Sequence, residues 1–234
     1  SLAAIISAKK CEINKRVLLV HHQATKPRIF QKFFENYVDH IISKVSTDIL
    51  AVSVATSDSL CKQRYLLTKS NSIKVVYNGL EIDKPSSSIF NLRDKYKISA
   101  ENRIIGIVGR VEKYKGHEDL ILAYSLLKKT FQSKIQLIFI GSGHKLEIDR
   151  LTKLQNSLDF ENPIIFTGYI EGESKSIIEQ MDMLCMVTKD FEGFGLTIGE
   201  AMLSNVPVLV TRVGAIPEFV FDDIASIVNP ESPH

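Results

Sequence analysis

The sequence predicts an α/β fold in which helices cover both faces of a doubly wound parallel sheet. Two observations support this prediction. Short apolar runs alternate with longer stretches of helical periodicity from residue 103 to residue 210, and the same alternation, with fewer strands, precedes residue 82. Strands that alternate with helices in this way pair in parallel, because each helix carries the chain back to the starting edge of the sheet.

The elements of the second part are expected where the apolar runs begin and end. They are strands at 103–108, 136–140, 164–166, 183–187 and 206–210, and helices at 117–129, 146–158, 174–181 and 197–203. Pro217 and Glu218 are expected to open a further short helix, because proline is tolerated in the first turn of a helix.

The first part is expected to contain fewer strands. The expected elements are the end of a helix at 1–10, strands at 17–20, 49–54 and 73–77, an amphipathic helical stretch at 29–45 and a helix at 57–67. Asn78 and Gly79 predict a tight turn. The segment Lys84–Ser88 is linker-like, and a short helix is expected at 90–96.

Composition is ordinary for a globular protein: of the 234 residues, 44% are hydrophobic and 24% are charged, with a net charge of +2. Acidic and basic residues are interspersed, so no nucleic-acid partner is expected. No apolar run approaches the roughly 20 residues of a membrane span, and no signal peptide is evident. Cys11, Cys61 and Cys185 are scattered without a C-x-x-C pair, which argues against a disulfide framework or zinc site and favours the cytoplasm.

The stretch Lys189–Met202 carries the strongest functional signal. It follows an expected strand, and its glycines lead into a helix that should begin near Leu196 or Thr197. The free N–H groups and the dipole of a helix N-terminus favour an anion such as a phosphate. Glu192 lies at the mouth of this loop. Glu200 lies about one turn into the helix, where its carboxylate could accept two hydrogen bonds from a vicinal diol.

A second candidate segment follows the strand at 103–108 and runs from Gly109 to Gly116. It lacks the G-x-G-x-x-G spacing of nicotinamide-binding proteins. Instead it places Arg110 and Lys115 at the carboxyl edge of the sheet, ahead of a helix. A guanidinium and an ammonium hold phosphate oxygens in complementary ways, so both cations could bind a diphosphate. The alternative is two ordinary surface cations.

Together these segments resemble the retaining glycosyltransferases of glycosyltransferase family 4, the group 1 glycosyltransferases, which have the GT-B fold. The resemblance rests on the two glutamates around E-G-F-G-L, the following E-A-M and the G-R-x4-K-G pattern, and it covers about residues 17–220. It implies part of a Rossmann-like, acceptor-side domain at 1–82, a linker at 83–102 and a Rossmann-like donor-binding domain at 103–234. Because family members have a longer first domain and further helices at the end, we expect both ends to be truncated.

The resemblance also implies roles for individual residues. Arg110 and Lys115 would grip the donor diphosphate, Glu192 would contact the donor sugar, and Glu200 would hold the ribose hydroxyls. His21 would face the reacting sugar. The expected catalytic residues are therefore His21, Arg110, Lys115 and Glu192. The expected donor-binding residues are Gly141, Tyr169, Ile170, Gly193, Phe194, Gly195, Leu196, Thr197 and Glu200. The main chain at residues 169 and 170 would read uracil.

Several of these positions have an alternative interpretation. Gly141 is equally expected as a simple strand-to-helix turn, and Phe194 is equally expected to pack in a core. His22 competes with His21 for the sugar-facing position. His117 is expected to be a helix-start residue rather than a catalyst. The segment Gly214–Glu218 departs from the family's G-G-x-P-E pattern at its second residue, which puts a close backbone approach there in doubt.

The function that the resemblance implies is transfer of a sugar from a UDP-sugar to a saccharide acceptor, lipid-linked in bacterial surface polysaccharide assembly. No cofactor and no metal are expected, since the sequence has no Asp-x-Asp motif. The amphipathic stretch Arg28–Val45, with basic residues nearby, could contact the inner face of the plasma membrane, or its apolar stripe could cover the first sheet. Two other functions stay open: a nucleotide-sugar binding module without turnover, and a GT-B relative such as a nucleotide-sugar epimerase.

Overall fold

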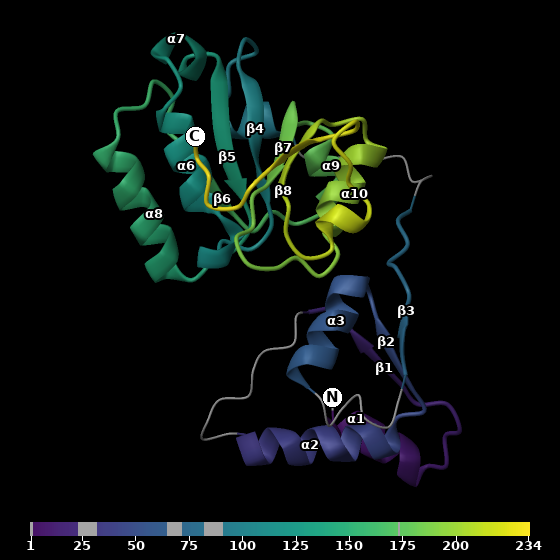
Figure 1. The fold of residues 1–234 in the computed structure, drawn as a ribbon. Coiled ribbons are helices and arrows are strands. Elements are labelled where there is room, and N and C mark those ends of the chain that lie inside the picture. Colours follow the sequence, from purple (N-terminus) through teal and green to yellow (C-terminus); the bar gives the residue numbers. More distant parts are fainter. Residues whose placement is uncertain (1, 23–31, 65–71, 82–90, 173) are drawn as a thin grey trace. The chain divides into compact units, whose positions relative to one another are not determined.

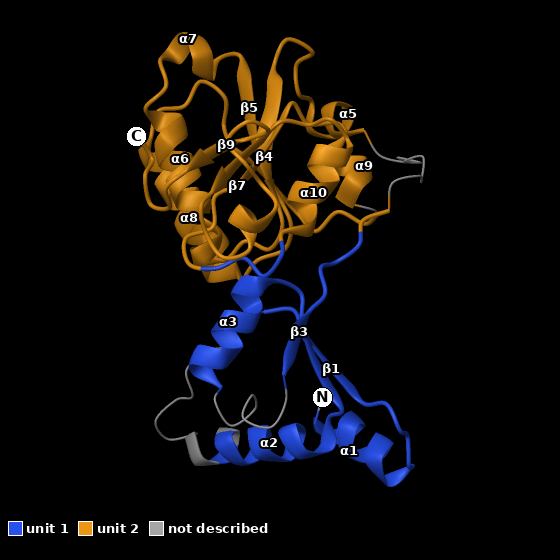
Figure 2. Cartoon of the chain, turned by 45° about the vertical axis from the view of Figure 1, so that its right-hand side comes forward, with its two compact units in different colours: residues 1–79, 191–194 blue, residues 80–190, 195–234 orange. Residues whose placement is uncertain are grey.

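The computed structural model describes residues 2–22, 32–64, 72–81, 91–172 and 174–234. It divides into two compact units (Figure 2). The first consists of residues 1–79 with 191–194, and the second of residues 80–190 with 195–234. The expected linker at 83–102 stays a prediction, because residues 82–90 lie outside the described part of the chain.

The first unit contains a parallel three-stranded sheet in the order β1-β2-β3 (Figure 1). Its strands are β1 Val17–Val20, β2 Asp48–Ala51 and β3 Ile73–Val75, and its helices are α1 Leu2–Lys10, α2 Lys32–Val45 and α3 Val54–Gln63. The small core of the unit forms around Ile49, Ala51 and Leu60, with Leu18 and Ile42 packed against them.

Several boundaries in this unit differ from the expected ones. β2 ends at Ala51, and α3 begins at Val54 rather than at residue 57. The reason is the cap: the Ser53 hydroxyl accepts a hydrogen bond of 3.0 Å from the backbone nitrogen of Thr56, which fixes the helix start three residues early. β3 ends at Val75, and the expected turn at Asn78–Gly79 is an irregular segment instead.

The second unit contains a parallel six-stranded sheet in the order β6-β5-β4-β7-β8-β9, and the strand order reverses between β4 and β7. This arrangement confirms the predicted doubly wound fold. The strands are β4 Arg103–Val108, β5 Ile135–Ile140, β6 Ile165–Gly168, β7 Met183–Met186, β8 Val208–Thr211 and β9 Ser226–Val228. The short edge strand β9, which pairs with β8, was not predicted.

Helices cover both faces of this sheet (Figure 1). They are α5 Leu92–Tyr96, α6 His117–Ser125, α7 Lys129–Gln132, α8 Lys145–Ser157, α9 Ser174–Ile178 and α10 Leu196–Leu203, with 3-10 turns η2 Lys113–Lys115 and η3 Ile216–Glu218. Alternate strand residues face opposite layers. Ile138 and Ile140 pack with α9 and α10, whereas Leu137 and Phe139 pack with α6 and α8.

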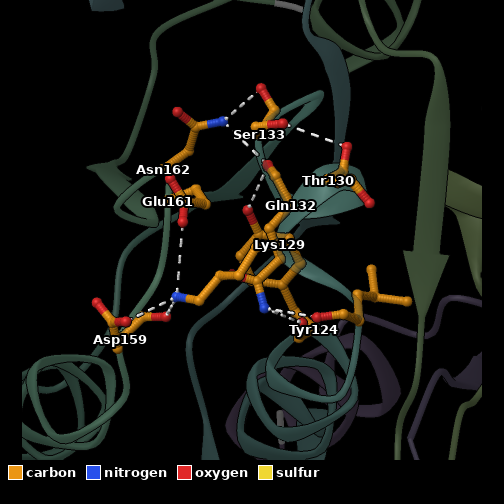
Figure 3. Close-up of polar contacts among 9 residues, drawn as sticks. Tyr124, Lys129, Thr130, Gln132, Ser133, Asp159, Glu161 and Asn162 are labelled. Atoms are coloured by element: carbon orange, nitrogen blue, oxygen red, sulfur yellow. Dashed lines mark hydrogen bonds and ion pairs between the residues drawn. The ribbon is translucent and has the colours of Figure 1, made fainter.

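The expected helix at 117–129 is broken into α6 and α7 by a polar network (Figure 3). The Tyr124 hydroxyl donates to the carbonyl oxygens of Gln132 and Ile135 at 3.1 and 3.2 Å, and the side-chain amide of Asn162 donates to the same two carbonyls at 3.0 and 2.9 Å. At the break itself, the side-chain amide of Gln132 donates to the carbonyl oxygens of Tyr124 and Leu127 at 3.3 and 2.9 Å, so a side chain meets backbone groups that a continuous helix would have paired. Burial also raises the pKa of Tyr124 to about 12.

The remaining differences are at element ends. The helix expected at 174–181 stops at Ile178, and the strand expected at 206–210 begins at Val208. The short helix expected at Pro217 is the single 3-10 turn η3. Cys185 is fully buried in β7, as expected for a small core residue, and burial raises the pKa of its thiol to about 12.

Candidate functional site

The point where the strand order reverses places the two predicted segments at one edge of the sheet. Gly109 and Arg110 follow β4, and the segment that leads to α10 follows the neighbouring parallel strand β7. Ligands of open α/β sheets bind outside the carboxyl ends of the strands at this position. The cations and the start of α10 therefore lie on the same rim of the sheet.

Hydrogen bonds connect the two segments beyond their strands. The backbone nitrogen of Lys189 donates to the carbonyl oxygen of Tyr114 at 2.7 Å, and the Thr188 hydroxyl donates to the same oxygen at 3.1 Å. Lys115 follows Tyr114 directly, and its ammonium nitrogen lies 5.4 Å from the centroid of that ring. The turn that carries Lys115 is thus fixed to the exit of β7.

A cavity of about 290 Å³ opens beside β4 and β5. It is lined by Val108, Gly109, Arg110, Ile140, Gly141, Ser142, Tyr169, Ile170, Gly172, Ser174 and Ile177. The lining is largely apolar and is interrupted by backbone groups at the glycines, a composition that suits a flat heterocycle held by a few polar contacts. Four of the predicted site residues, namely Arg110, Gly141, Tyr169 and Ile170, share this cavity.

Arg110 provides the positive charge at the cavity. Its side chain is 62% exposed, and one guanidinium nitrogen lies 2.6 Å from a carboxylate oxygen of Glu112. This exposed pair contributes little to stability, because water screens both charges. The guanidinium has further donors for an anion, since five N–H groups share its planar fork.

The backbone at Gly141 is consistent with both of its interpretations. Its φ of 142° and its contact with the carbonyl of Gly109 leave no room for a β-carbon, and its nitrogen donates to the carbonyl of Gly168 at 2.9 Å. Gly141 is therefore a required strand-exit turn and also lines the cavity. Tyr169 is 73% exposed at the cavity, whereas the Ile170 side chain is buried.

The start of α10 has the geometry expected of an anion-binding helix N-terminus. Gly195 is the N-cap in the left-handed conformation, with φ of 85°, and no side chain caps the helix. The first N–H groups, at Leu196 and Thr197, therefore lack a side-chain cap. One turn further, Glu200 accepts a hydrogen bond of 2.6 Å from the hydroxyl of Ser174, a cavity residue.

The remaining predicted residues belong to the first unit. His21 follows β1 and is exposed, as is His22. Gly193 is buried against the carbonyl oxygen of His21, where a β-carbon would overlap that oxygen. Glu192 precedes it and is half-buried. His21 and the Glu192–Gly193 segment are thus brought together within this unit.

Phe194 also belongs to the first unit and fits the packing interpretation. Its ring centroid lies 6.2 Å from that of Tyr77, with the planes tilted by 45°. The expected sugar-facing loop is therefore divided between the two units after Phe194, because Gly195 and α10 belong to the second.

Comparison with known proteins identifies the family. Residues 88–234, more than half of the chain, match the sequence profile of the glycosyl transferases group 1. The chain belongs to this family.

One archaeal and one bacterial relative show how much of a longer protein this chain matches. It is 26% identical over 203 residues to an uncharacterised glycosyltransferase of Methanocaldococcus jannaschii, covering 84% of this chain and 50% of that protein. It is 28% identical over 214 residues to the capsular polysaccharide biosynthesis glycosyltransferase CapM of Staphylococcus aureus, covering 84% of this chain and 53% of that protein. The chain thus spans about half the length of these relatives.

Solved structures of similar fold confirm the predicted GT-B fold class. HepE of Anabaena, crystallised with UDP and glucose, aligns with a TM-score of 0.81 and 22% identity over all of this chain and 64% of its own. WaaG, which takes part in lipopolysaccharide biosynthesis, aligns with a TM-score of 0.75 and 14% identity over 98% of this chain and 68% of its own.

The sequence did not reveal one contributor to the site, Ser174, and one ion pair next to the turn that carries Lys115. Ser174 is expected from the sequence only as a helix start, and its spacing from Glu200 gives no signal. The Lys189 ammonium forms an ion pair of 2.7 Å with Asp119, and the two side chains are 17% and 15% exposed. Lys189 lies at the start of the predicted loop, so the sequence indicates that it is near the site. The sequence gives no signal that it pairs with Asp119.

His117 is a core residue at the start of α6, consistent with the expected helix-start position. Its ring meets Phe139 edge to face at 4.9 Å, and both ring nitrogens are buried. Burial lowers the pKa of His117 to about 4, and the nearby Glu147 carboxylate offsets this only in part. The imidazole is therefore neutral at physiological pH.

No three histidine, cysteine, aspartate or glutamate side chains gather as metal ligands within the described part of the chain. None of its described helices is long and apolar enough to cross a bilayer.

Proposed function

We propose that this group 1 glycosyltransferase is a retaining hexosyltransferase of glycosyltransferase family 4. Its donor is a UDP-sugar and its acceptor a lipid-linked saccharide in the assembly of a bacterial surface polysaccharide, such as O-antigen, lipopolysaccharide or capsule. Relatives support this assignment: CapM is named for capsular polysaccharide biosynthesis, and WbdA of Escherichia coli for serotype-specific mannosyl transfer. HepE was crystallised with UDP-glucose.

The observation that carries the proposal is the cavity at the strand-order reversal. Its apolar walls, at Val108, Ile140 and Ile170, suit a uracil ring whose polar edge meets the main chain near Tyr169. Arg110 lies at the same cavity, and Ser174 links its wall to Glu200. Base, ribose and diphosphate would thus each meet a group of matching chemistry.

In the proposed mechanism, the bond between the anomeric carbon and the diphosphate oxygen breaks, and the electron pair leaves with UDP. Arg110, Lys115 and the N-terminus of α10 stabilise the negative charge that grows on the diphosphate, in place of a divalent metal. Glu192 orients the donor sugar and Glu200 the ribose. No cofactor takes part.

Retention follows when the acceptor hydroxyl attacks from the face that the leaving group vacates. The new bond joins the acceptor oxygen to the anomeric carbon, and the acceptor proton passes to the departing diphosphate. His21 lies at the end of β1, where we assign it to the sugar-facing side. No protein nucleophile is needed on this route.

The test combines binding with turnover. The full-length protein is titrated calorimetrically with UDP and a panel of UDP-sugars, and products made with saccharide acceptors are analysed for anomeric configuration. We expect UDP binding and a product with the donor's configuration. Binding without any product would favour the nucleotide-sugar binding module, and release of UDP without an acceptor would favour an epimerase. Absence of UDP binding would overturn the proposal.

We further propose that the protein works in the cytoplasm as a peripheral protein at the inner face of the plasma membrane. In α2, Phe34 and Tyr37 are 70% and 63% exposed, and α1, which contacts α2, ends in Lys9 and Lys10. Exposed aromatic rings beside lysines suit an anionic lipid surface. Basic residues at 26 and 28, part of the same expectation, lie outside the described residues.

Vesicle flotation tests this surface. The double variant Phe34→Ser/Tyr37→Ser should lose binding to phosphatidylglycerol vesicles. Phe131→Ser, at a similarly exposed aromatic residue of α7, is the matched control and should retain it. Equal flotation of both variants would contradict a role for α2.

A further inference from the structure

Ser174 and Glu200 form a contact between two helices that meet at the cavity. Ser174 is the first residue of α9, and α9 packs against α10, which carries Glu200. The Ser174 hydroxyl donates to Glu200 Oε2 at 2.6 Å. Both residues are half-buried, and Ser174 itself lines the cavity.

This hydrogen bond has the length of a strong one. Bonds from a hydroxyl to a carboxylate fall at about 2.5–2.7 Å and are roughly twice as strong as neutral pairs. A glutamate has three side-chain torsions, and a fixed partner on one oxygen restricts them. Because a carboxylate accepts about four hydrogen bonds, Glu200 keeps capacity for a vicinal diol while Ser174 is bound.

We propose that Ser174 is a positioning residue that holds the Glu200 carboxylate in the orientation needed to bind the two ribose hydroxyls of the nucleotide donor. This inference rests on the proposed function. It assigns to the first turn of α9 a part in distinguishing ribonucleotides from nucleotides without those hydroxyls. Without the Ser174 hydroxyl, the Glu200 side chain is free to adopt other rotamers and to be hydrated. Binding of the diol would then have to order the Glu200 carboxylate, which costs binding free energy.

The experiment compares two nucleotides that differ only at the ribose. UDP and 2′,3′-dideoxy-UDP are titrated calorimetrically into the full-length protein and its variants. Unmodified protein should bind UDP more tightly. Ser174→Ala should weaken UDP binding about tenfold, the scale of one charge-assisted hydrogen bond, and leave dideoxy-UDP binding unchanged. Ser174→Thr, which restores a hydroxyl, should recover most of the UDP affinity.

Two further variants separate positioning from general stability. Ser204 lies at the other end of α10, and its hydroxyl lies 3.4 Å from a carboxylate oxygen of Glu179, just beyond α9. Ser204→Ala removes this second serine–glutamate contact between the same helices, so it should leave the affinities for both nucleotides unchanged. In a Glu200→Gln background, Ser174→Ala should have little additional effect on UDP binding, because the two residues act as one unit.

The outcomes are distinct. Selective loss of UDP affinity in Ser174→Ala, with recovery in Ser174→Thr, supports the inference. Equal loss for UDP and dideoxy-UDP, or no loss for either, overturns it and leaves the proposed function standing. If the unmodified protein binds no UDP, the proposed function fails, and this inference fails with it.

Discussion

Gly116 lies directly against the carbonyl oxygen of Val187, in the left-handed region with φ of 75°. A β-carbon at residue 116 would overlap that oxygen. Gly116 ends the turn that carries Lys115, and Val187 follows the last residue of β7. This contact therefore fixes the turn after β4 against the exit of the strand next to it.

Gly116→Ala is expected to disturb both segments. The substitution combines a positive φ with a backbone overlap, so we expect the free energy of unfolding to fall by about 2 kcal/mol or more. Urea unfolding measures the loss, and UDP titration should show weaker binding. Gly79→Ala is the control, because no atom lies within 4 Å of the β-carbon position there. A Gly116→Ala variant as stable as the parent would contradict the close contact.

Lys115→Ala should lower turnover about 10²-fold or more, since charge stabilisation on the leaving diphosphate is greatest in the transition state. The measurement is kcat with a saturating UDP-sugar. Lys113→Ala removes an exposed lysine from the same 3-10 turn and serves as the matched control. A change in thermal stability alone, with turnover intact, would remove Lys115 from the site.

The ion pair between Lys189 and Asp119 should contribute measurably to folding. Asp119 Oδ2 is buried and has no hydrogen-bond partner within the described residues, so the carboxylate depends on the ammonium for compensation. Lys189→Met should lower the free energy of unfolding by about 2 kcal/mol, less than for a fully buried pair. Combining it with Asp119→Leu should recover most of that loss.

The control for this pair is Arg212, whose ion pair of 3.1 Å with Asp222 is exposed on both sides. Arg212→Met should change the free energy of unfolding by less than about 0.5 kcal/mol. Urea unfolding measures both variants. If Lys189→Met and Arg212→Met lower the free energy of unfolding equally, burial does not strengthen the ion pair of Lys189.

His117 should make folding sensitive to mild acid. Its pKa is about 4 in the folded protein, against an ordinary value of 6.5, so the unfolded state binds more protons between these values. Its contribution to stability is present above pH 6.5 and is lost as the pH falls toward 4. Between pH 7 and pH 5 the free energy of unfolding should fall by about 2 kcal/mol from this residue.

Urea unfolding of the parent and of His117→Gln at both pH values measures this term. The variant lacks the titrating group, so its stability should depend less on pH over the same interval. Parallel pH profiles for the two proteins would show that His117 is not the source. The carboxylate of Glu147, whose pKa is lowered chiefly by its hydrogen bond to Arg150, loses its contribution only below this interval.

The strands of the second unit could be predicted because their apolar runs are largely buried and several end at glycines. β4 was predicted with its observed bounds, and β5 and β7 to within one residue. The short edge strand β9 was missed, because two of its three residues are exposed and its sequence carries no long apolar run. Edge strands depend on their neighbour for pairing, which a local pattern does not reveal.

Helix ends were predicted less well, because some of them also depend on contacts with distant parts of the chain. The side chain of Gln132, which lies beyond the break after Ser125, reaches back to the carbonyl oxygens of Tyr124 and Leu127. The early start of α3 is a local effect, and the serine cap at Ser53 could have been recognised. Long-range hydrogen bonds can end a helix where the local periodicity predicts that it continues. A capping residue, by contrast, lies next to the helix in the sequence and can be recognised there.

The sequence by itself determined the doubly wound sheet and the presence of cations and carboxylates at strand ends, because hydrophobic period and glycine placement are local properties. Only the tertiary structure decided which of these groups meet. It placed Arg110 and Tyr169 at one cavity, joined Ser174 to Glu200 and packed Gly193 against the carbonyl of His21. Such pairs form between segments far apart in the chain, so they depend on strand order and packing rather than on spacing in the sequence.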